Sequence, residues 1–361
     1  MVTVPAGLVG VCARPARAAM AAPLPERLRR GFNLPDQAPL RAERIPRRET
    51  LQALRKLGMS HVRLPVVGEF LLPAFSGPAT ISATLDDVNR VVDMLLSLGY
   101  AVTVDMHPGS DLGALIARDP AHAQRALADG WRQLAKQLLR WPSEFVFAEL
   151  LNEPPMPDAL WRSMARALIE EARGVAASHY LIVGPAPYQR PDALLAWEPF
   201  ADSRIVYACH YYSPMVFTHQ GADWEKGSPW AKAAGVPFPT HRDDTELINL
   251  ARQARSSGND ALAQELGQMA QQNCNAESID AEFEALAAWS ARTGAPVIIN
   301  EFGVLKRNVK REHRLAWLSA TRRAAESHGF GWAHWDYASD FGLLDRSGAL
   351  DEGVIRALLS P

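Results

Sequence analysis

The chain has 361 residues, of which 48% are hydrophobic and 22% are charged. This length suits one large barrel or two ordinary domains, and the apolar content excludes a disordered protein. A formal net charge of -2, without a basic run, gives no reason to expect nucleic acid or an anionic membrane as a partner. The three cysteines, Cys12, Cys209 and Cys274, are too widely spaced for a disulfide framework or a zinc site.

The N-terminal segment 1–28 is expected to be either disordered or the remnant of a secretory leader. Residues 18–23 have the small side chains of a cleavage zone, but no basic segment precedes the apolar part. Arg14 and Arg17 also fall where a leader is normally uncharged. No apolar stretch in the sequence reaches the roughly 18 residues that span a bilayer.

From Arg30 onward, short apolar runs alternate with amphipathic segments, which is typical of βα units and a parallel sheet. Proline cannot donate to a sheet ladder, so we expect Pro65 and Pro154 to end the second and fourth strands. The strands predicted in the first half are 31–34, 61–65, 100–106 and 145–153. The helices predicted there are 46–57, 85–98, 122–140 and 158–177.

The second half continues the alternation, with one long interruption after the sixth strand. The predicted strands are 180–183, 204–209, 296–301 and 330–335, and the predicted closing helices are 311–327 and 351–359. Eight such units indicate a single (β/α)8 TIM barrel over residues 29–361. We interpret 218–277, with helices at 243–255 and 260–272, as a two-helix insertion over the active-site face.

Polar or aromatic side chains stand at most of the predicted strand ends, close to Pro or Gly. In an α/β barrel these ends form the face where chemistry occurs. The set contains two glutamates, several hydrogen-bond donors and an aromatic platform, a combination that suits cleavage of a glycosidic bond. One carboxyl group would protonate the leaving oxygen, and the other would attack the sugar or position a water. The residues are Arg63, His107, Asn152, Glu153, His210, Tyr212, Glu301 and Trp335.

The chain resembles glycoside hydrolase family 5, the cellulase-like retaining β-glycosidases with catalytic glutamates on barrel strands four and seven. The resemblance runs from Gly31 to about Gly342. The Asn-Glu-Pro motif alone is shared by a whole clan, whereas all the motifs in this order are specific. They are Gly31-Phe-Asn33, Arg63-Leu-Pro65, His107, Leu151-Asn-Glu-Pro154, His210-Tyr-Tyr212, Asn300-Glu-Phe-Gly303 and Trp335.

The resemblance implies a role for each matching side chain. Glu153 would be the acid/base and Glu301 the nucleophile, with Asn152 bonding the sugar 2-hydroxyl. Arg63 and Tyr212 would hydrogen-bond Glu301 and keep it ionised.

The remaining matches would support or line the same site. His107 and His210 would line the subsite of the cleaved sugar, with His210 near Glu153, and Trp335 would be its stacking floor. Asn33 would support the site, although it could equally form a turn.

Other residues are read from their positions alone. Glu149 should point into the barrel, and we expect Arg63 as its partner because a buried charge needs one. Asp105 is expected to support the site or fill the barrel. Sugar contact and simple packing both stay open for Trp224 and Trp230, while Asp336, Tyr337 and Asp340 could reach substrate.

We expect no cofactor and no metal. The partner would be a β-linked oligo- or polysaccharide bound by a monomer, with no nucleic acid and no membrane insertion. This substrate class favours a periplasmic or secreted protein. The first expectation is an endo-β-glucanase; exo-β-glucosidase, β-mannanase and an exopolysaccharide-processing hydrolase or transglycosylase stay open.

Two rival classes use the same fold. A metal-dependent hydrolase built on Asp105, His107, His210 and His334 lacks compact ligand spacing. A glycan-binding barrel without turnover has no support, because both glutamates are present.

Overall fold

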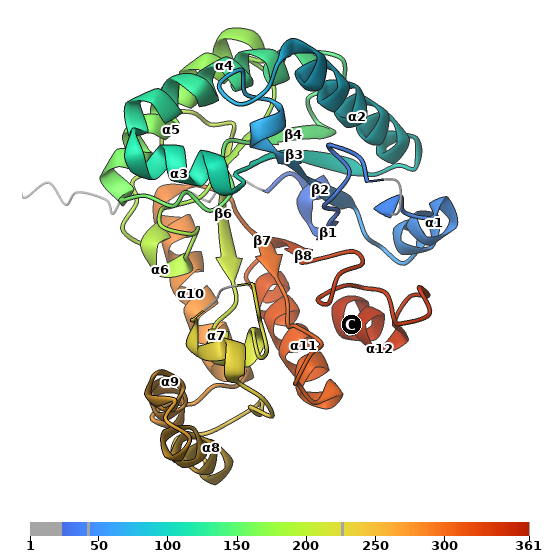
Figure 1. The fold of residues 1–361 in the computed structure, drawn as a ribbon. Helices are drawn as coiled ribbons and strands as arrows, with labels where there is room; N and C mark the ends of the chain where they lie inside the picture. The colour runs from blue at the N-terminus through green and yellow to red at the C-terminus, as the bar shows by residue number, and fades with distance from the viewer. Residues whose placement is uncertain (1–23, 42–43, 225–226, 361) are drawn as a thin grey trace, which may run out of the picture.

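A computed structural model describes residues 24–41, 44–224 and 227–360 (Figure 1). Eight parallel strands follow one another around a closed barrel, in which β1 lies beside β8. The predicted (β/α)8 architecture is therefore confirmed. The strands are β1 Arg30–Asn33, β2 His61–Val67, β3 Ala101–His107, β4 Val146–Glu149, β5 Leu181–Val183, β6 Ile205–Tyr211, β7 Val297–Phe302 and β8 Gly331–His334.

Helices surround the barrel and bury their apolar sides against the strands (Figure 1). They are η1 Glu26–Leu28, α1 Arg48–Lys56, η3 Gly68–Phe70, α2 Pro78–Ser97, α3 Ser110–Arg118, α4 Pro120–Leu138, α5 Asp158–Val175, α6 Pro191–Leu194, α7 Met215–Thr218, η4 Pro229–Lys232, α8 Thr245–Ser256, α9 Asp260–Ala270, α10 Ala276–Thr293, α11 Arg311–Ser327 and α12 Glu352–Leu359. No helix within the described ranges is both long and apolar enough to cross a membrane.

Some helix boundaries differ from the prediction. Helix α2 begins at Pro78 rather than near 85, because proline is well suited to the first helical turn and Ile81 continues the buried face toward Val88. The segment after β3 forms two helices where one was expected. Asp119 separates α3 from α4 and caps α4, accepting a hydrogen bond from the His122 N–H at 3.0 Å.

Pro65 lies inside β2, so the prediction that it ends the strand was wrong. The backbone groups of Arg63 and Val67 face the β1 side, since Leu34 N–H donates to the Arg63 carbonyl and Val67 N–H donates to that of Ala38. The pairing of β1 with β2 stops at Asn33 and Arg63. Pro65 therefore faces a position beyond β1, where its missing N–H interrupts no strand pairing.

Strand β4 is shorter than predicted and ends at Glu149. Two backbone bonds still tie the following residues to the neighbouring strands: Leu150 N–H donates to Ile182 at 3.0 Å, and Asn152 N–H donates to Met106 at 2.9 Å. Asn152 and Glu153 consequently lie in a short tethered loop above the barrel rather than on the strand itself.

The lower part of the barrel interior is apolar. Leu24 and Leu28 pack there against a cluster that includes Phe147, Ile182 and Ile298. The expectation of a disordered 1–28 segment is thus wrong for residues 24–28, because their leucines close the N-terminal end of the barrel. Residues 1–23 lie outside the described ranges.

The insertion between β6 and β7 contains a helical hairpin, α8 and α9, that projects from one side of the molecule beside α7 (Figure 1). Its two ends meet: Thr240 and Cys274 form an antiparallel bridge, and Asp243 N–H donates to the Ala270 carbonyl at 2.8 Å. The long helix α10 then leads back into β7 and was not predicted.

Candidate active site

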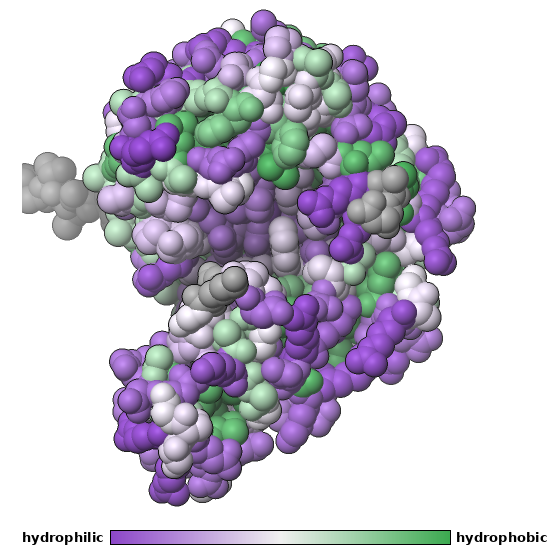
Figure 2. Space-filling view, viewed as in Figure 1, coloured by the Kyte–Doolittle hydropathy of each residue, from purple (hydrophilic) through white to green (hydrophobic). Residues whose placement is uncertain are grey.

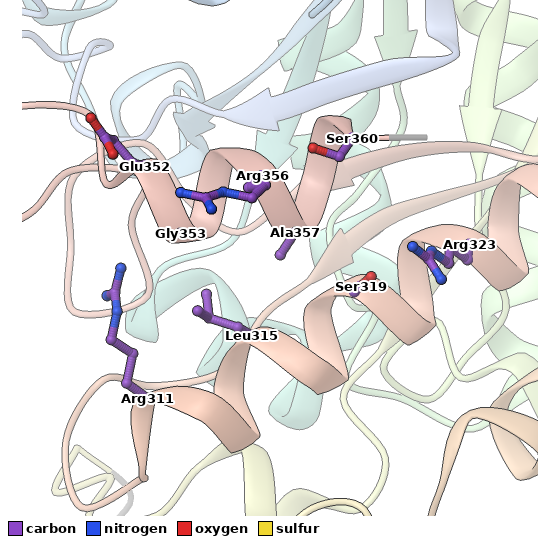
Figure 3. A pocket seen from close by; sticks show the side chains of 9 residues that line it. All are labelled: Arg311, Leu315, Ser319, Arg323, Glu352, Gly353, Arg356, Ala357 and Ser360. Atoms are coloured by element: carbon purple, nitrogen blue, oxygen red, sulfur yellow. The ribbon is translucent and has the colours of Figure 1, made fainter.

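A cleft of about 800 Å³ lies at the C-terminal ends of the barrel strands. Figure 2 shows a hollow, largely hydrophilic region in the middle of this face. The cleft is formed by the C-terminal residues of β2, β3 and β7 and by loops that follow β1, β4, β6, β7 and β8. Among its lining residues are Asp36, Arg44, His107, Asn152, Glu153, Tyr212, Met215, His219, Trp224, Glu301, Arg307, Trp335, Asp336 and Asp340. A separate pocket, lined by residues of α11 and α12 such as Leu315 and Arg356, includes neither of the two glutamates (Figure 3).

The two glutamates face each other inside the cleft. One carboxylate oxygen of Glu153, one of Glu301 and a ring nitrogen of His210 all lie within 4.8 Å of one another. His210 Nδ1 is 2.8 Å from Glu153 Oε1 and 3.5 Å from Glu301 Oε2. The structure thus brings strand-four and strand-seven carboxylates to the separation at which one can act as acid and the other as nucleophile.

Arg63 organises the upper layer of the barrel around Glu301. Its Nη1 donates to Glu301 Oε1 at 2.6 Å and to Asn33 Oδ1 at 2.9 Å, while its Nη2 donates to Asn152 Oδ1 at 2.8 Å. Asn33 is the last residue of β1 and is fully buried, so it supports Arg63 and is not a turn former.

Below this layer, Arg63 also holds two buried carboxylates. Its Nε donates to Glu149 Oε2 at 2.6 Å, which confirms the predicted partner of Glu149, and its Nη2 lies 3.1 Å from Asp105 Oδ2. Asp105 in turn is 2.9 Å from His107 Nδ1. A single, fully buried guanidinium therefore contacts three carboxylates, two of them without solvent access, an arrangement that fixes its position strongly.

Three further predicted residues complete the walls of the cleft. Tyr212 donates its hydroxyl to Glu301 Oε2 at 3.1 Å. The Trp335 ring lies nearly parallel to the His107 ring, at 16° and with the centroids 6.1 Å apart, so the two rings form adjoining surfaces of the cleft.

Burial dominates the protonation of the two glutamates. It raises the pKa of Glu153 to about 7, against the opposing effects of His107 and Arg63. It also raises the pKa of Glu301, although His210 and Arg63 act in the other direction. The expectation of a net lowering at Glu301 was wrong, because desolvation outweighs its positively charged and donating neighbours.

The pKa values of the two histidines are shifted in opposite directions. Burial lowers the pKa of His210 to about 4, so this ring is neutral near pH 7. Burial also acts to lower the pKa of His107, but the hydrogen bond with the Asp105 carboxylate outweighs this effect, and the pKa of His107 is raised. A neutral imidazole thus contacts Glu153, while a more basic one lies at the Trp335 side.

The four residues proposed for a metal enzyme do not form one ligand set, although Asp105 and His107 are in contact. His334 points away from the cleft and packs edge-on against Phe302, with ring centroids 5.7 Å apart. Within the described ranges, the group that could hold a metal is instead Glu153, His210 and Glu301. Arg63 already occupies one oxygen of Glu301, and its positive charge disfavours a second cation there.

The remaining candidates divide between cleft and core. Trp224, Asp336 and Asp340 line the cleft, whereas Tyr337 packs against Phe32. Trp230 is partly buried against the core and does not line the cleft, and four further tryptophans and one cysteine are buried in the core. These are Trp131, Trp141, Trp161, Trp289 and Cys209.

Three residues of the site were not predicted from the sequence: Gln189, Asn300 and Arg307. Arg307 lines the cleft. Asn300 Nδ2 donates to Glu149 Oε2 at 2.8 Å, and Gln189 bonds both Glu149 and Glu153. Asn300 stands beside Glu301 at a strand end, a signal that could have identified it. Gln189 follows β5 in an irregular loop, where no periodicity indicates the direction of its side chain.

A barrel with two facing carboxylates at its C-terminal mouth defines a glycosidase-type site. The sequence model described as Cellulase (glycosyl hydrolase family 5) matches residues 30–340. The chain belongs to glycosyl hydrolase family 5, and the protein is a glycoside hydrolase.

Curated relatives agree over most of the chain. Endoglucanase 3 of Fibrobacter succinogenes is 29% identical over 325 residues, which are 83% of this chain but only 47% of that protein. Endoglucanase C of Acetivibrio thermocellus is 25% identical over 297 residues, covering 80% of this chain and 82% of the relative. A mutant form of Thermotoga maritima Cel5A, solved with cellobiose, shares the fold with a TM-score of 0.75 and 24% identity, over 93% of this chain and 97% of that one.

Proposed function

We propose that this protein is a retaining endo-β-glucanase in which Glu153 is the acid/base and Glu301 the nucleophile. The observation that carries the mechanism is that one carboxylate oxygen of Glu153 and one of Glu301 lie within 4.8 Å of each other. Retaining glycosidases have carboxyl groups about 5–5.5 Å apart, whereas inverting enzymes leave roughly 6.5–9.5 Å for a water.

The contacts support this division of roles. Arg63 and Tyr212 each donate to an oxygen of Glu301, so they stabilise its ionised form and hold it for attack on the anomeric carbon. Within the part of the chain that the structure describes, Glu153 forms no ion pair with an arginine or lysine, and its pKa of about 7 lets it keep a proton near neutral pH. The proton shared by the pair accordingly resides on Glu153.

In the first step, a Glu301 oxygen bonds to the anomeric carbon while the glycosidic bond breaks and Glu153 protonates the departing oxygen. In the second step, Glu153 removes a proton from a water, whose oxygen displaces Glu301 from the sugar. Asn152 would bond the sugar 2-hydroxyl, a role supported by its position in the cleft lining and by its hydrogen bond from Arg63.

The substrate class is supported by relatives that include Endoglucanase 3 and Endoglucanase C, and by the shape of the site. Loops from most strands line a long hydrophilic recess rather than a closed pocket (Figure 2). Attack within a β-glucan chain is the activity that this shape favours. A product profile over defined β-glucan, mannan and exopolysaccharide oligomers tests the choice, and exclusive release of single glucose units would indicate an exo-enzyme.

The mechanism is tested by stereochemistry. NMR should detect the β-anomer of the product first, and initial α-product would exclude double displacement. Glu301→Ala should lose turnover and use azide to form an α-glycosyl azide from an activated substrate. Glu153→Ala should form the β-azide. The reverse pattern would exchange the roles of the two glutamates, and binding without turnover by the unmodified protein would indicate a glycan-binding barrel.

A further inference from the structure

Gln189 occupies an unusual place directly beneath the cleft. It follows β5, has a left-handed backbone with φ 52, and its side chain is completely buried. Gly184 provides the room for it: a Cβ atom at 184 would lie 2.5 Å from Gln189 Nε2 and closer still to its Cγ. The loop after β5 is therefore built to direct this amide into the barrel.

The two ends of the amide bind different glutamates. Gln189 Oε1 accepts a hydrogen bond from the Glu153 backbone N–H at 2.7 Å, and Gln189 Nε2 donates to Glu149 Oε1 at 3.1 Å. Arg63 and Asn300 also donate to Glu149, so this carboxylate is a fixed acceptor. Its position determines the orientation of the amide, because a flipped amide would place oxygen against oxygen.

The backbone of Gln189 holds the other neighbour of Glu153. The Gln189 carbonyl accepts a hydrogen bond from the His210 N–H at 2.9 Å, and the His210 ring contacts the Glu153 carboxyl at 2.8 Å. One residue thus fixes both the main chain of Glu153 and the imidazole that touches its side chain.

Glu153 needs such support because its own backbone is left-handed, with φ 41. A side chain other than glycine adopts this conformation at an energetic cost and keeps it only where the surroundings impose it. The bond to Gln189 satisfies the N–H of the strained residue and prevents it from turning toward an extended conformation.

We propose that Gln189 is a positioning residue for proton transfer: it holds the Glu153 backbone so that the carboxyl group reaches the glycosidic oxygen. The inference rests on the proposed function, because it takes Glu153 as the acid. It adds a residue on the loop after β5, which contributes nothing to the lining of the cleft.

The proposal predicts a dependence on the leaving group. A dinitrophenolate leaving group departs with little protonation, whereas a phenolate must be protonated by Glu153 as it leaves. A displaced Glu153 should therefore slow only the reaction of the phenyl substrate. For Gln189→Met, which keeps the size and removes both bonds, kcat/KM for phenyl β-cellobioside should fall about tenfold to a hundredfold. The value for 2,4-dinitrophenyl β-cellobioside should change less than about threefold.

A second variant separates function from stability. Gln189→Glu retains an oxygen acceptor for the Glu153 N–H but sets a carboxyl group against Glu149. The ratio of its kcat/KM values for the two substrates should stay within about threefold of the ratio for the unmodified enzyme, while its melting temperature falls. Gln220→Met is the matched control: Gln220 is equally buried and bonds only backbone groups of Phe217 and Val236, so this variant should lose stability without changing the discrimination.

Each outcome decides the proposal. Equal losses on both substrates in Gln189→Met, no loss on either, or the same selective loss in Gln189→Glu would overturn it. Glu153→Ala provides the reference, with a large loss on the phenyl substrate and a small one on the dinitrophenyl substrate. Failure of that reference would refute the proposed role of Glu153 itself, whereas a normal reference with an unselective Gln189→Met would refute only the inference.

Discussion

Arg63 Nη1 lies 2.6 Å from Glu301 Oε1, and this ion pair is the upper part of a buried network whose lower part is structural. The same guanidinium donates to Glu149 and contacts Asp105. The Arg63 guanidinium, which binds the proposed nucleophile, thus also balances the charge of two further carboxylates buried inside the barrel.

Replacement of Arg63 by methionine should therefore impair folding and catalysis together. Three carboxylates would lose their cation, at a cost of roughly 3–5 kcal/mol in the free energy of unfolding. Arg63→Lys should also be poor, because an ammonium group cannot form the same set of directed bonds. Urea unfolding and kcat/KM measure the two effects; Arg90→Met, which removes an exposed ion pair with Asp87, should change neither markedly.

The pH dependence of activity should reflect Glu153. Activity should decline as the pH rises through about 7, because Glu153 then loses the proton that it must donate. On the acid side, activity should decline as Glu301 gains a proton, at a pH above the ordinary range for glutamate because its pKa is raised. The profile of kcat/KM measures both limbs, and a basic limb that persists unchanged in Glu153→Gln would contradict the assignment.

The stability of the folded protein should also decrease as Glu153 loses its proton. The folded protein binds a proton at Glu153 up to a pH of about 7, whereas an unfolded glutamate releases it near 4.5. The folded state therefore loses stability relative to the unfolded chain as the pH rises between these values. Glu153→Gln should melt at a higher temperature than the unmodified protein above pH 7 but not below 4.5. Glu170→Gln, on the exposed side of α5, should show no such pH-dependent gain.

The fold could be predicted from the sequence because each βα unit carries its own periodicity and terminating residues. The site residues beside strand ends, such as Glu153 and Glu301, could be located for the same reason. Gln189 could not, because its direction depends on a loop conformation and on the space left by Gly184. The sign of the pKa shift at Glu301 depends on burial in three dimensions, which no local pattern reveals.

We expect one part of the insertion between β6 and β7 to contact substrate and the helical hairpin not to contact it. Trp224 lines the cleft and is 54% exposed, whereas no residue of α8 or α9 is among those that line it. Trp224→Ala should therefore change the distribution of oligosaccharide lengths. Joining residues 243 and 270 by a short turn should leave it unchanged, because these residues already meet through a backbone hydrogen bond. A changed product distribution in a folded hairpin deletion would show that the helices act on the substrate.

Removal of metal ions should leave activity intact. Both oxygens of Glu301 already receive hydrogen bonds, one of them from a guanidinium, so a cation would compete with Arg63 for this site. Turnover should be equal before and after dialysis against EDTA. Loss of activity with recovery on addition of a divalent ion would revive the metal-dependent alternative.

Leu24 and Leu28 close the N-terminal end of the barrel, while the cleft opens at the other end. Glu153 and Glu301 line this cleft, so water and protons reach the charged interior past these two side chains. A sugar chain lying in the cleft would obstruct that route. The protonation states present when the substrate binds would then be retained during the first chemical step, so the pH of the surrounding solution acts on the free enzyme more than on the occupied one.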